Sequence, residues 1–328
     1  MFRIIFKTLV ALAALAGAIF TAAFVMILWS DPEFPAPLAP SPEDLKEMAA
    51  SFEQPYPAVK RSFRMRDGAT LNAQYLAADS KTTIVLVHGV LSSSFPLNRT
   101  SGLLREAAAA EVVAIDLRGH GASGGRPGDT DYIGQYEDDL ADVIREIRAK
   151  RPGGKVILAG HSMGGGIALR YALRTGVPPV DGYLLLAPHL GPKSPTTSTE
   201  TSAAGARFVQ IHIPRILGLF VMNSAGIKAF NGLRTLFFNL PPEVPLRSYT
   251  YRAMAGSAPD DYRPALAAVR VPLLVIVGSR DEAFKADRYE ATVRSYSRGT
   301  VTIVPGATHD GILHDPRAMA AVAAWARG

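Results

Sequence analysis

Ser162 is the residue of this 328-residue chain whose surroundings first suggest chemistry. It stands at the centre of the pentapeptide GHSMG at 160–164, which matches the pattern G-x-S-x-G. An apolar run at 156–159 precedes it, as in a buried strand, and residues 167–173 carry apolar side chains at helical spacing. A serine in a sharp strand-to-helix turn exposes its hydroxyl for nucleophilic attack, and the N–H groups of the helix start point at the reaction centre. An ordinary strand–helix turn with a solvent-facing serine is the alternative.

Two further polar residues follow predicted strands later in the chain. Asp281 comes soon after the apolar run at 272–277, and His309 follows the run at 300–304. The loops after the strands of an open parallel sheet share one edge, where ligands bind. We therefore expect Ser162, Asp281 and His309 to meet at that edge. A serine whose proton passes to a histidine, itself oriented by a carboxylate, can attack an acyl carbon.

Other residues compete for the same roles. Glu282 and Asp287 are alternatives to Asp281, which lies nearest to the strand end, and His314 is an alternative to His309 but falls in a predicted helix. The remaining candidates are interpreted as structural: His88, His120, His161, Arg118 and Arg126. No group of His and Asp has the spacing of metal ligands, so the sequence predicts neither a metal site nor a cofactor.

Several segments together resemble the α/β-hydrolase fold, in which the triad also follows the order serine, acid, histidine. They are HG at 88–89, GHGAS at 119–123, GHSMG at 160–164, and the strand ends GSRD at 278–281 and GATH at 306–309. Across residues 59–328 the chain is similar to serine hydrolases of the monoacylglycerol lipase, lysophospholipase and serine aminopeptidase group.

That resemblance implies an oxyanion hole made by the backbone N–H groups of Met163 and Val90. Ser162 would be the nucleophile, His309 the general base and then acid, and Asp281 the residue that orients the imidazole. The chain reads HGVLS from residue 88, where members of that group often read H-G-x-G-E.

The elements that must position these residues alternate between strand and helix. The predicted strands lie at 59–65, 70–77, 83–87, 112–116, 156–159, 182–187, 272–277 and 300–304. Helical patterns occupy 96–110, 132–150, 286–296 and 316–326. This order predicts a mostly parallel eight-stranded sheet with helices on both faces, built from residues 58–188 and 265–328.

The insert at 189–264 interrupts this alternation. It begins with a Ser/Thr/Pro-rich loop at 191–202 and continues with apolar material that we interpret as helical, including 233 and 236–238. Its eight Lys/Arg and four Asp/Glu leave a charge of +4. We expect a helical cap over the carboxyl edge of the sheet. Its apolar side chains suggest a lipid-like ligand, and three of its basic residues could touch an anionic lipid surface: Arg207, Arg215 and Arg234. Complete burial of the apolar groups within the cap is the alternative.

The N-terminal segment predicts a membrane anchor. Residues 8–29 contain no charged residue over 22 positions, and as a helix they would span roughly 33 Å, enough for a hydrocarbon core of about 30 Å. Arg3 and Lys7 precede the segment and acidic residues follow it. This asymmetry predicts a single-pass anchor at 1–30 in the inner membrane and an extracytoplasmic catalytic part after a Pro-rich linker at 31–57. A cleaved signal peptide, which would give a secreted or periplasmic protein, is the alternative.

Composition excludes several classes of function. The chain has no cysteine, so it has neither disulfides nor thiolate metal sites. A net charge of +6 without interleaved basic and aromatic residues gives no sign of nucleic-acid binding. The prediction is a membrane-tethered serine hydrolase that cleaves carboxylic esters of lipid-like or acyl substrates. The alternatives are an amidase, aminopeptidase or thioesterase with the same triad, or a non-catalytic binding protein of this fold.

Overall fold

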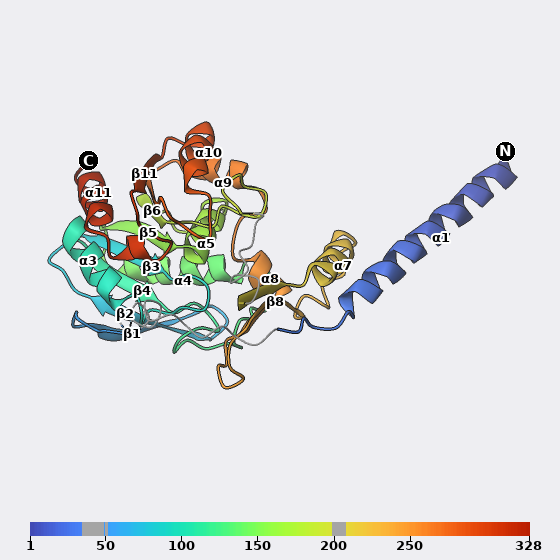
Figure 1. Cartoon of the computed structure of the whole chain (residues 1–328), viewed down its shortest axis with the longest axis horizontal. Coiled ribbons are helices and arrows are strands. Elements are labelled where there is room, and N and C mark those ends of the chain that lie inside the picture. The colour runs from blue at the N-terminus through green and yellow to red at the C-terminus, as the bar shows by residue number, and fades with distance from the viewer. Residues whose placement is uncertain (35–48, 50–51, 199–207) are drawn as a thin grey trace.

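A computed structural model describes residues 1–34, 49, 52–198 and 208–328. Most of the predicted linker, part of the Ser/Thr/Pro-rich loop and Arg207 therefore lie outside the described residues. Figure 1 shows a compact body from which one long helix, α1 (Phe2–Ile27), extends. By length and composition α1 could cross a membrane, as the sequence predicted.

One eight-stranded sheet forms the centre of the body. Its strands are β1 (Val59–Arg64), β2 (Thr70–Leu76), β3 (Thr82–Val87), β4 (Glu111–Ile115), β5 (Lys155–His161), β6 (Gly182–Leu186), β10 (Leu273–Gly278) and β11 (Thr300–Val304). Their spatial order is β1-β2-β4-β3-β5-β6-β10-β11, antiparallel from β1 through β2 to β4 and parallel elsewhere. The predicted mostly parallel sheet of eight strands is confirmed.

Helices cover both faces of the sheet. One layer contains α4 (Gln135–Lys150), α5 (Met163–Ala172), α9 (Tyr262–Ala268) and α10 (Tyr289–Tyr296), and the other contains α3 (Asn98–Ala108) and α11 (Pro316–Arg327). Side chains alternate between the two layers along each central strand. On β3, Val85 and Val87 pack in the first layer, whereas Ile84 and Leu86 pack in the second. This double burial explains why the central strands are continuous apolar runs.

The cap differs from the predicted helical insert because it is mixed. Its described elements are β7 (Val209–Ile211), α7 (Ile213–Ser224), β8 (Arg234–Phe238), β9 (Ser248–Thr250) and α8 (Tyr251–Ala255). β7, β8 and β9 form a small antiparallel sheet. The residues from 233 to 238 were expected to be helical, but a short apolar run does not distinguish helix from strand by periodicity. Pairing with strands on both sides decides the outcome for β8.

Candidate active site

Ser162 lies at the turn between β5 and α5, at the carboxyl edge of the sheet. Its backbone has φ 52° and ψ −115°, a positive φ that non-glycine residues rarely adopt. Two glycines permit this turn: a Cβ on Gly160 would collide with the backbone of Gly164, and a Cβ on Gly164 would collide with the carbonyl of Val87. The two glycines of the G-x-S-x-G pattern are therefore required by close approach of β5, α5 and β3.

Asp281 and His309 contact each other on the loops after β10 and β11. The Asp281 Oδ2 atom lies 2.9 Å from His309 Nδ1, and the Asp281 side chain is 0% exposed. Its other oxygen accepts hydrogen bonds from the N–H groups of Ala283 and Phe284, at 2.9 and 2.8 Å. Because Nδ1 faces a carboxylate, the neutral imidazole carries its proton there and presents an unprotonated Nε2. That nitrogen has no partner among the described residues.

The charge of His309 depends on this contact. Burial of the ring lowers its pKa, but the hydrogen bond and the negative charge of Asp281 outweigh burial, so the pKa of His309 is raised above its ordinary 6.5. His161, whose ring centroid lies 4.8 Å away, behaves oppositely. Burial and the neighbouring His309 lower the pKa of His161 to about 4, so at neutral pH this ring is uncharged.

Packing links the serine turn to the histidine loop. The N–H of His189 donates to the carbonyl of Ser162 at 3.0 Å, and the His189 ring stacks on Phe284 with centroids 5.5 Å apart. Phe284 in turn meets the His309 ring edge-on at 5.4 Å. The hydroxyl of Ser162 makes no hydrogen bond to a described residue. The hydrogen bond between a nucleophilic serine and its base is often long before substrate binds. The three predicted residues thus share one edge of the sheet, with the histidine and the aspartate in direct contact.

Two backbone N–H groups next to Ser162 are free. Neither the N–H of Met163, the first residue of α5, nor that of Val90 donates to another described residue. Gly89 brings the Val90 loop close, because a Cβ at that glycine would lie 3.4 Å from the Ser162 Cβ. The residue after Val90, Leu91, has φ 59°. These two positions are those at which the sequence predicted an oxyanion hole.

A tyrosine of the cap, which the sequence analysis missed, holds this loop. The hydroxyl of Tyr249, on β9, accepts the N–H of Leu91 at 2.8 Å and lies 2.8 Å from His120 Nε2. His120 Nδ1 is 2.9 Å from the carbonyl of Arg118, which can only accept, so Nε2 accepts the tyrosine proton. Burial and the nearby His88 lower the pKa of His120 to about 3, so the ring is neutral at neutral pH, as this chain of hydrogen bonds requires. Nothing in the sequence around Tyr249 signals a partner so far away.

His88 supports the same loop from the sheet. Its Nε2 accepts the N–H of Leu117 at 3.1 Å, which leaves Nδ1 to donate to the carbonyl of Gly89 at 2.7 Å. Burial lowers the pKa of His88 to about 4, so it also remains neutral. Both nitrogens are used within the fold, which agrees with a structural role.

The competing acids and histidine make other contacts. Asp287 is 71% exposed and pairs with its neighbour Arg288 at 3.1 Å. Glu282 accepts the backbone N–H of His309 at 3.1 Å and does not touch its ring nitrogens. His314 follows a short 3-10 turn, not a helix interior, and its Nε2 lies 3.2 Å from the hydroxyl of Thr100. Asp281 is the described carboxylate that the His309 imidazole contacts.

The two arginines of the glycine-rich loop brace it against the core and the cap. Arg118 pairs with the buried Asp139 at 2.6 Å, and Arg126 pairs with Asp129 at 2.7 Å. Arg252 of the cap joins Asp129 at 2.8 Å, so the cap and the loop share one carboxylate.

One group of described residues could be considered for a metal: His161, His309 and Asp310, whose ligating atoms lie within 4.8 Å of one another. Two of its members serve other contacts, since His309 Nδ1 faces Asp281 and His161 Nε2 faces the His309 carbonyl at 3.3 Å. A metal on His309 Nε2 would occupy the nitrogen that could accept a serine proton. Metal binding would therefore compete with the proposed function of His309 as a base, and we assign no metal to this group.

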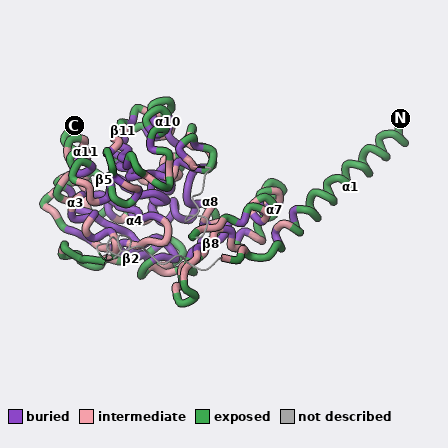
Figure 2. The backbone as a smooth tube through the Cα atoms, viewed as in Figure 1, coloured by how far each residue is buried: buried purple, intermediate pink, exposed green. Residues whose placement is uncertain are grey.

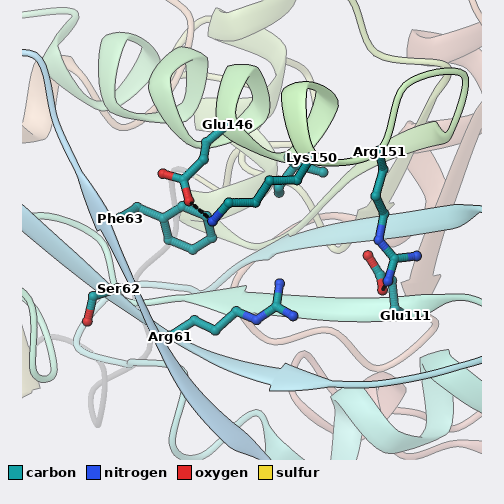
Figure 3. A pocket seen from close by; sticks show the side chains of 8 residues that line it. Arg61, Ser62, Phe63, Glu111, Glu146, Lys150 and Arg151 are labelled. Atoms are coloured by element: carbon teal, nitrogen blue, oxygen red, sulfur yellow. Dashed lines mark hydrogen bonds and ion pairs between the residues drawn. The ribbon is translucent and has the colours of Figure 1, made fainter.

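Figure 3 shows a pocket lined by charged side chains, which lies away from Ser162. Its walls come from β1, the start of β4 and the end of α4, and they hold the ion pairs Arg151–Glu111 and Lys150–Glu146. Because β3, β4 and β5 are parallel, the start of β4 is remote from the carboxyl edge that carries Ser162. The pocket does not include any of the predicted site residues.

Comparison with known proteins agrees with this architecture. Residues 84–324 match the model of a family described as the alpha/beta hydrolase family. The chain is 29% identical over 181 residues to the AB hydrolase superfamily protein YisY of Bacillus subtilis, covering 52% of this chain and 63% of that protein. It is 31% identical over 96 residues to the monoacylglycerol lipase of Mycolicibacterium smegmatis, covering 29% of this chain and 34% of the lipase. The chain thus spans less than two thirds of the length of these relatives.

Among solved structures, the fold is similar to that of a membrane phospholipase A described as a bacterial virulence factor. The TM-score is 0.56 at 19% identity, and the match covers 100% of this chain and 99% of that one. At this identity the likeness concerns the fold alone.

Proposed function

Because the chain belongs to the alpha/beta hydrolase family, we propose that it is a serine hydrolase that cleaves carboxylic esters through Ser162, His309 and Asp281. The contact that carries this proposal is the 2.9 Å pair between Asp281 and His309, at the sheet edge where Ser162 occupies its strained turn. A buried carboxylate on Nδ1 leaves Nε2 as the base, which is the arrangement that activates a serine.

In the proposed reaction, His309 Nε2 takes the proton of Ser162 as the serine oxygen attacks the acyl carbon. The oxyanion that forms accepts hydrogen bonds from the free N–H groups of Met163 and Val90, each worth a few kcal/mol in such sites. Collapse breaks the ester bond, and the leaving alcohol takes the proton from His309. Water then attacks the acyl-enzyme with His309 again as base, which regenerates Ser162 and releases the acid.

We propose a lipid-like or acyl ester as the substrate class. The names of relatives support this class, since one is a monoacylglycerol lipase and a protein of similar fold is a phospholipase A. Amide or thioester cleavage would use the same triad, and a non-catalytic protein would not react at Ser162. A fluorophosphonate probe that labels Ser162, followed by acyl esters of graded chain length, tests the mechanism and the substrate class in turn.

We propose that α1 crosses the inner membrane with its N-terminus in the cytoplasm and the body outside. A reporter enzyme that works only outside the cytoplasm should therefore be active when fused at Gly328. The full-length protein should also stay in the membrane fraction after carbonate extraction. A soluble product that begins near Thr21 would show instead that α1 is a cleaved signal.

Removing the hydroxyl of Tyr249 should loosen the proposed oxyanion hole. Tyr249→Phe keeps the ring but leaves the Leu91 N–H and His120 Nε2 without a partner. A lost buried hydrogen bond costs about 1–3 kcal/mol, so we expect kcat to fall by about tenfold with little change in KM. Steady-state kinetics on a soluble acyl ester measure this effect.

Tyr171→Phe is the matched control, because it also removes a tyrosine hydroxyl that is hydrogen-bonded within the fold, here to the carbonyl of Pro178 at the far end of α5. It should lower thermal stability without lowering kcat. Equal losses of kcat in both variants would show that Tyr249 acts only on stability.

A further inference from the structure

We propose that α7 and the turn after it lie in the membrane, in the leaflet next to the catalytic body, so that the cap is embedded in lipid by its own helix. This inference rests on the proposed membrane span of α1 and is independent of the serine mechanism. In this arrangement the exposed face of α7 contacts the hydrocarbon of the bilayer.

Close packing fixes α7 against the last turns of α1. A Cβ on Gly218 would collide with the carbonyl of Ala23 and lie 2.9 Å from the Ile27 side chain. Ala23 and Ile27 are fully buried in a cluster with Leu219, Met222 and Tyr251 of the cap. Small residues at such crossings let two helices approach closely within membranes. The depth of α7 is therefore determined by the position of α1.

Arg215 connects the start of α7 to the C-terminal end of α1. Its side chain is 9% exposed and donates to the carbonyls of Ile27 and Trp29 at 3.0 and 2.6 Å, and it pairs with Asp31 at 2.6 Å. These contacts satisfy carbonyls at the end of α1 that no further helical turn can satisfy. His212 adds a contact of 2.9 Å to the carbonyl of Ser30.

The sequence suggested that three arginines of the cap touch anionic lipid headgroups, and two of them make other contacts in the structure. Arg215 is engaged with α1, and Arg234 donates to the carbonyls of Pro127 and Ser248, both at 2.8 Å. Arg207 lies outside the described residues. The described part of the cap therefore supports an apolar contact with lipid in place of the electrostatic one.

From Arg215, α7 runs back along α1, beside its base in Figure 1. Its far end and the following segment form an open apolar groove with α1, lined by Phe20, Thr21, Phe24, Met222, Ile227 and Phe230. The rings of Phe24 and Phe230 meet at 5.9 Å. Phe20 precedes Ile27 by seven residues, roughly 10 Å along a helix axis, and one leaflet contributes about 15 Å of hydrocarbon. A membrane-spanning α1 would carry this end of α7 into the leaflet.

The outer face of α7 is suited to lipid. Ile213, Leu217 and Phe220 recur at helical spacing on one face and are 54%, 51% and 62% exposed. In Figure 2 most of α1 is coloured as exposed, and exposed residues also occur on α7 beside its base. An apolar stripe of this kind on a surface marks a contact with a partner or a membrane, and the adjoining apolar surface of α1 favours the membrane.

The side-chain amides and the hydroxyl at this end of the cap bond within the protein, which lowers the cost of placing them in hydrocarbon. Residues 216–227 carry no charge. Asn223 and Asn231 exchange two hydrogen bonds, at 2.6 and 2.9 Å, and Asn223 also donates to the Leu219 carbonyl. The hydroxyl of Ser224 donates to the carbonyl of Phe220 at 2.9 Å. Lys228 is exposed at the tip and long enough to extend toward headgroups.

Site-specific fluorescence in vesicles tests the inference, and the absence of cysteine makes single labels straightforward. Full-length Phe220→Cys, Leu217→Cys, Leu15→Cys and Glu243→Cys would each carry an environment-sensitive NBD label, in phosphatidylcholine vesicles with and without lipids spin-labelled in their acyl chains. Leu15 reports on α1, and Glu243, exposed on the β8–β9 loop, reports on cap surface away from α7. We expect the labels at 220 and 217 to be quenched at least threefold more than the label at 243, and in the same range as the label at 15.

Two results would overturn the inference. In the first, the label at position 15 is quenched but the labels at 220 and 217 are quenched no more than the label at 243. If the emission of the labels at 220 and 217 is not blue-shifted, α7 lies in water. If it is blue-shifted, α7 lies against a second copy of the protein. If position 15 is also unquenched, α1 does not span the bilayer, and the anchor and the inference fail together. Neither result depends on turnover, so failure of the serine mechanism remains separately visible in the Ser162→Ala variant.

Discussion

Ser162→Ala should abolish hydrolysis of acyl esters and labelling by a fluorophosphonate. In the proposed mechanism the serine oxygen forms the covalent bond to the acyl group, and alanine offers no atom that can do so. Comparable serine hydrolases lose about six orders of magnitude in kcat when the nucleophile is removed. We therefore expect only the small residual turnover that the oxyanion hole and substrate binding support without a nucleophile. Steady-state kinetics with a chromogenic ester and gel detection of the probe measure both effects.

The fold should survive this change, because the strained backbone at 162 depends on the close packing around Gly160 and Gly164 and not on the hydroxyl. The melting temperature is therefore the control, and Ser295→Ala is the matched variant. Ser295 is exposed on α10, and its hydroxyl bonds only the preceding turn of its own helix. Turnover by Ser162→Ala equal to that of Ser295→Ala would refute the serine mechanism.

Asp281→Asn should lower kcat by about 10⁴-fold, as in other triads. The asparagine amide can donate to Nδ1, which would place the imidazole proton on Nε2, where it can no longer accept the serine proton. Glu282→Gln and Asp287→Asn are the matched controls and should retain most of the activity, since neither carboxylate contacts the ring nitrogens of His309. Loss of activity in Asp287→Asn but not in Asp281→Asn would show that the acid is misassigned.

The pH profile of activity distinguishes a specific effect of Asp281 on His309 from a general loss of structure. Asp281 keeps the pKa of His309 above 6.5 despite burial, and only the neutral imidazole can accept a proton. Activity of the unmodified protein should therefore fall as the pH drops through a value above 6.5. Without the negative charge the pKa falls, so the residual activity of Asp281→Asn should persist to lower pH. An acidic limb at the same pH in both proteins would contradict this role of Asp281.

The sequence was sufficient for features that local patterns determine. Buried parallel strands are apolar on both faces, so the runs at β3, β4, β5 and β10 stood out, and their order implied which loops share an edge. The glycines around Ser162 were recognisable because a strained strand-to-helix turn tolerates few other residues. The charge-free length of α1 likewise follows from the thickness of a bilayer.

The tertiary structure decided what depends on partners that are distant in the chain. β8 is a strand because β7 and β9 flank it, although its apolar run by itself also allows a helix. The contact of Tyr249 with Leu91 joins the cap to the proposed oxyanion hole across 158 positions, and no local periodicity records such a pair. Arg215 looked like a surface cation, yet it closes the end of α1. Spacing along the chain specifies faces and turns, whereas the partner of a buried polar group is chosen only when separate elements pack together.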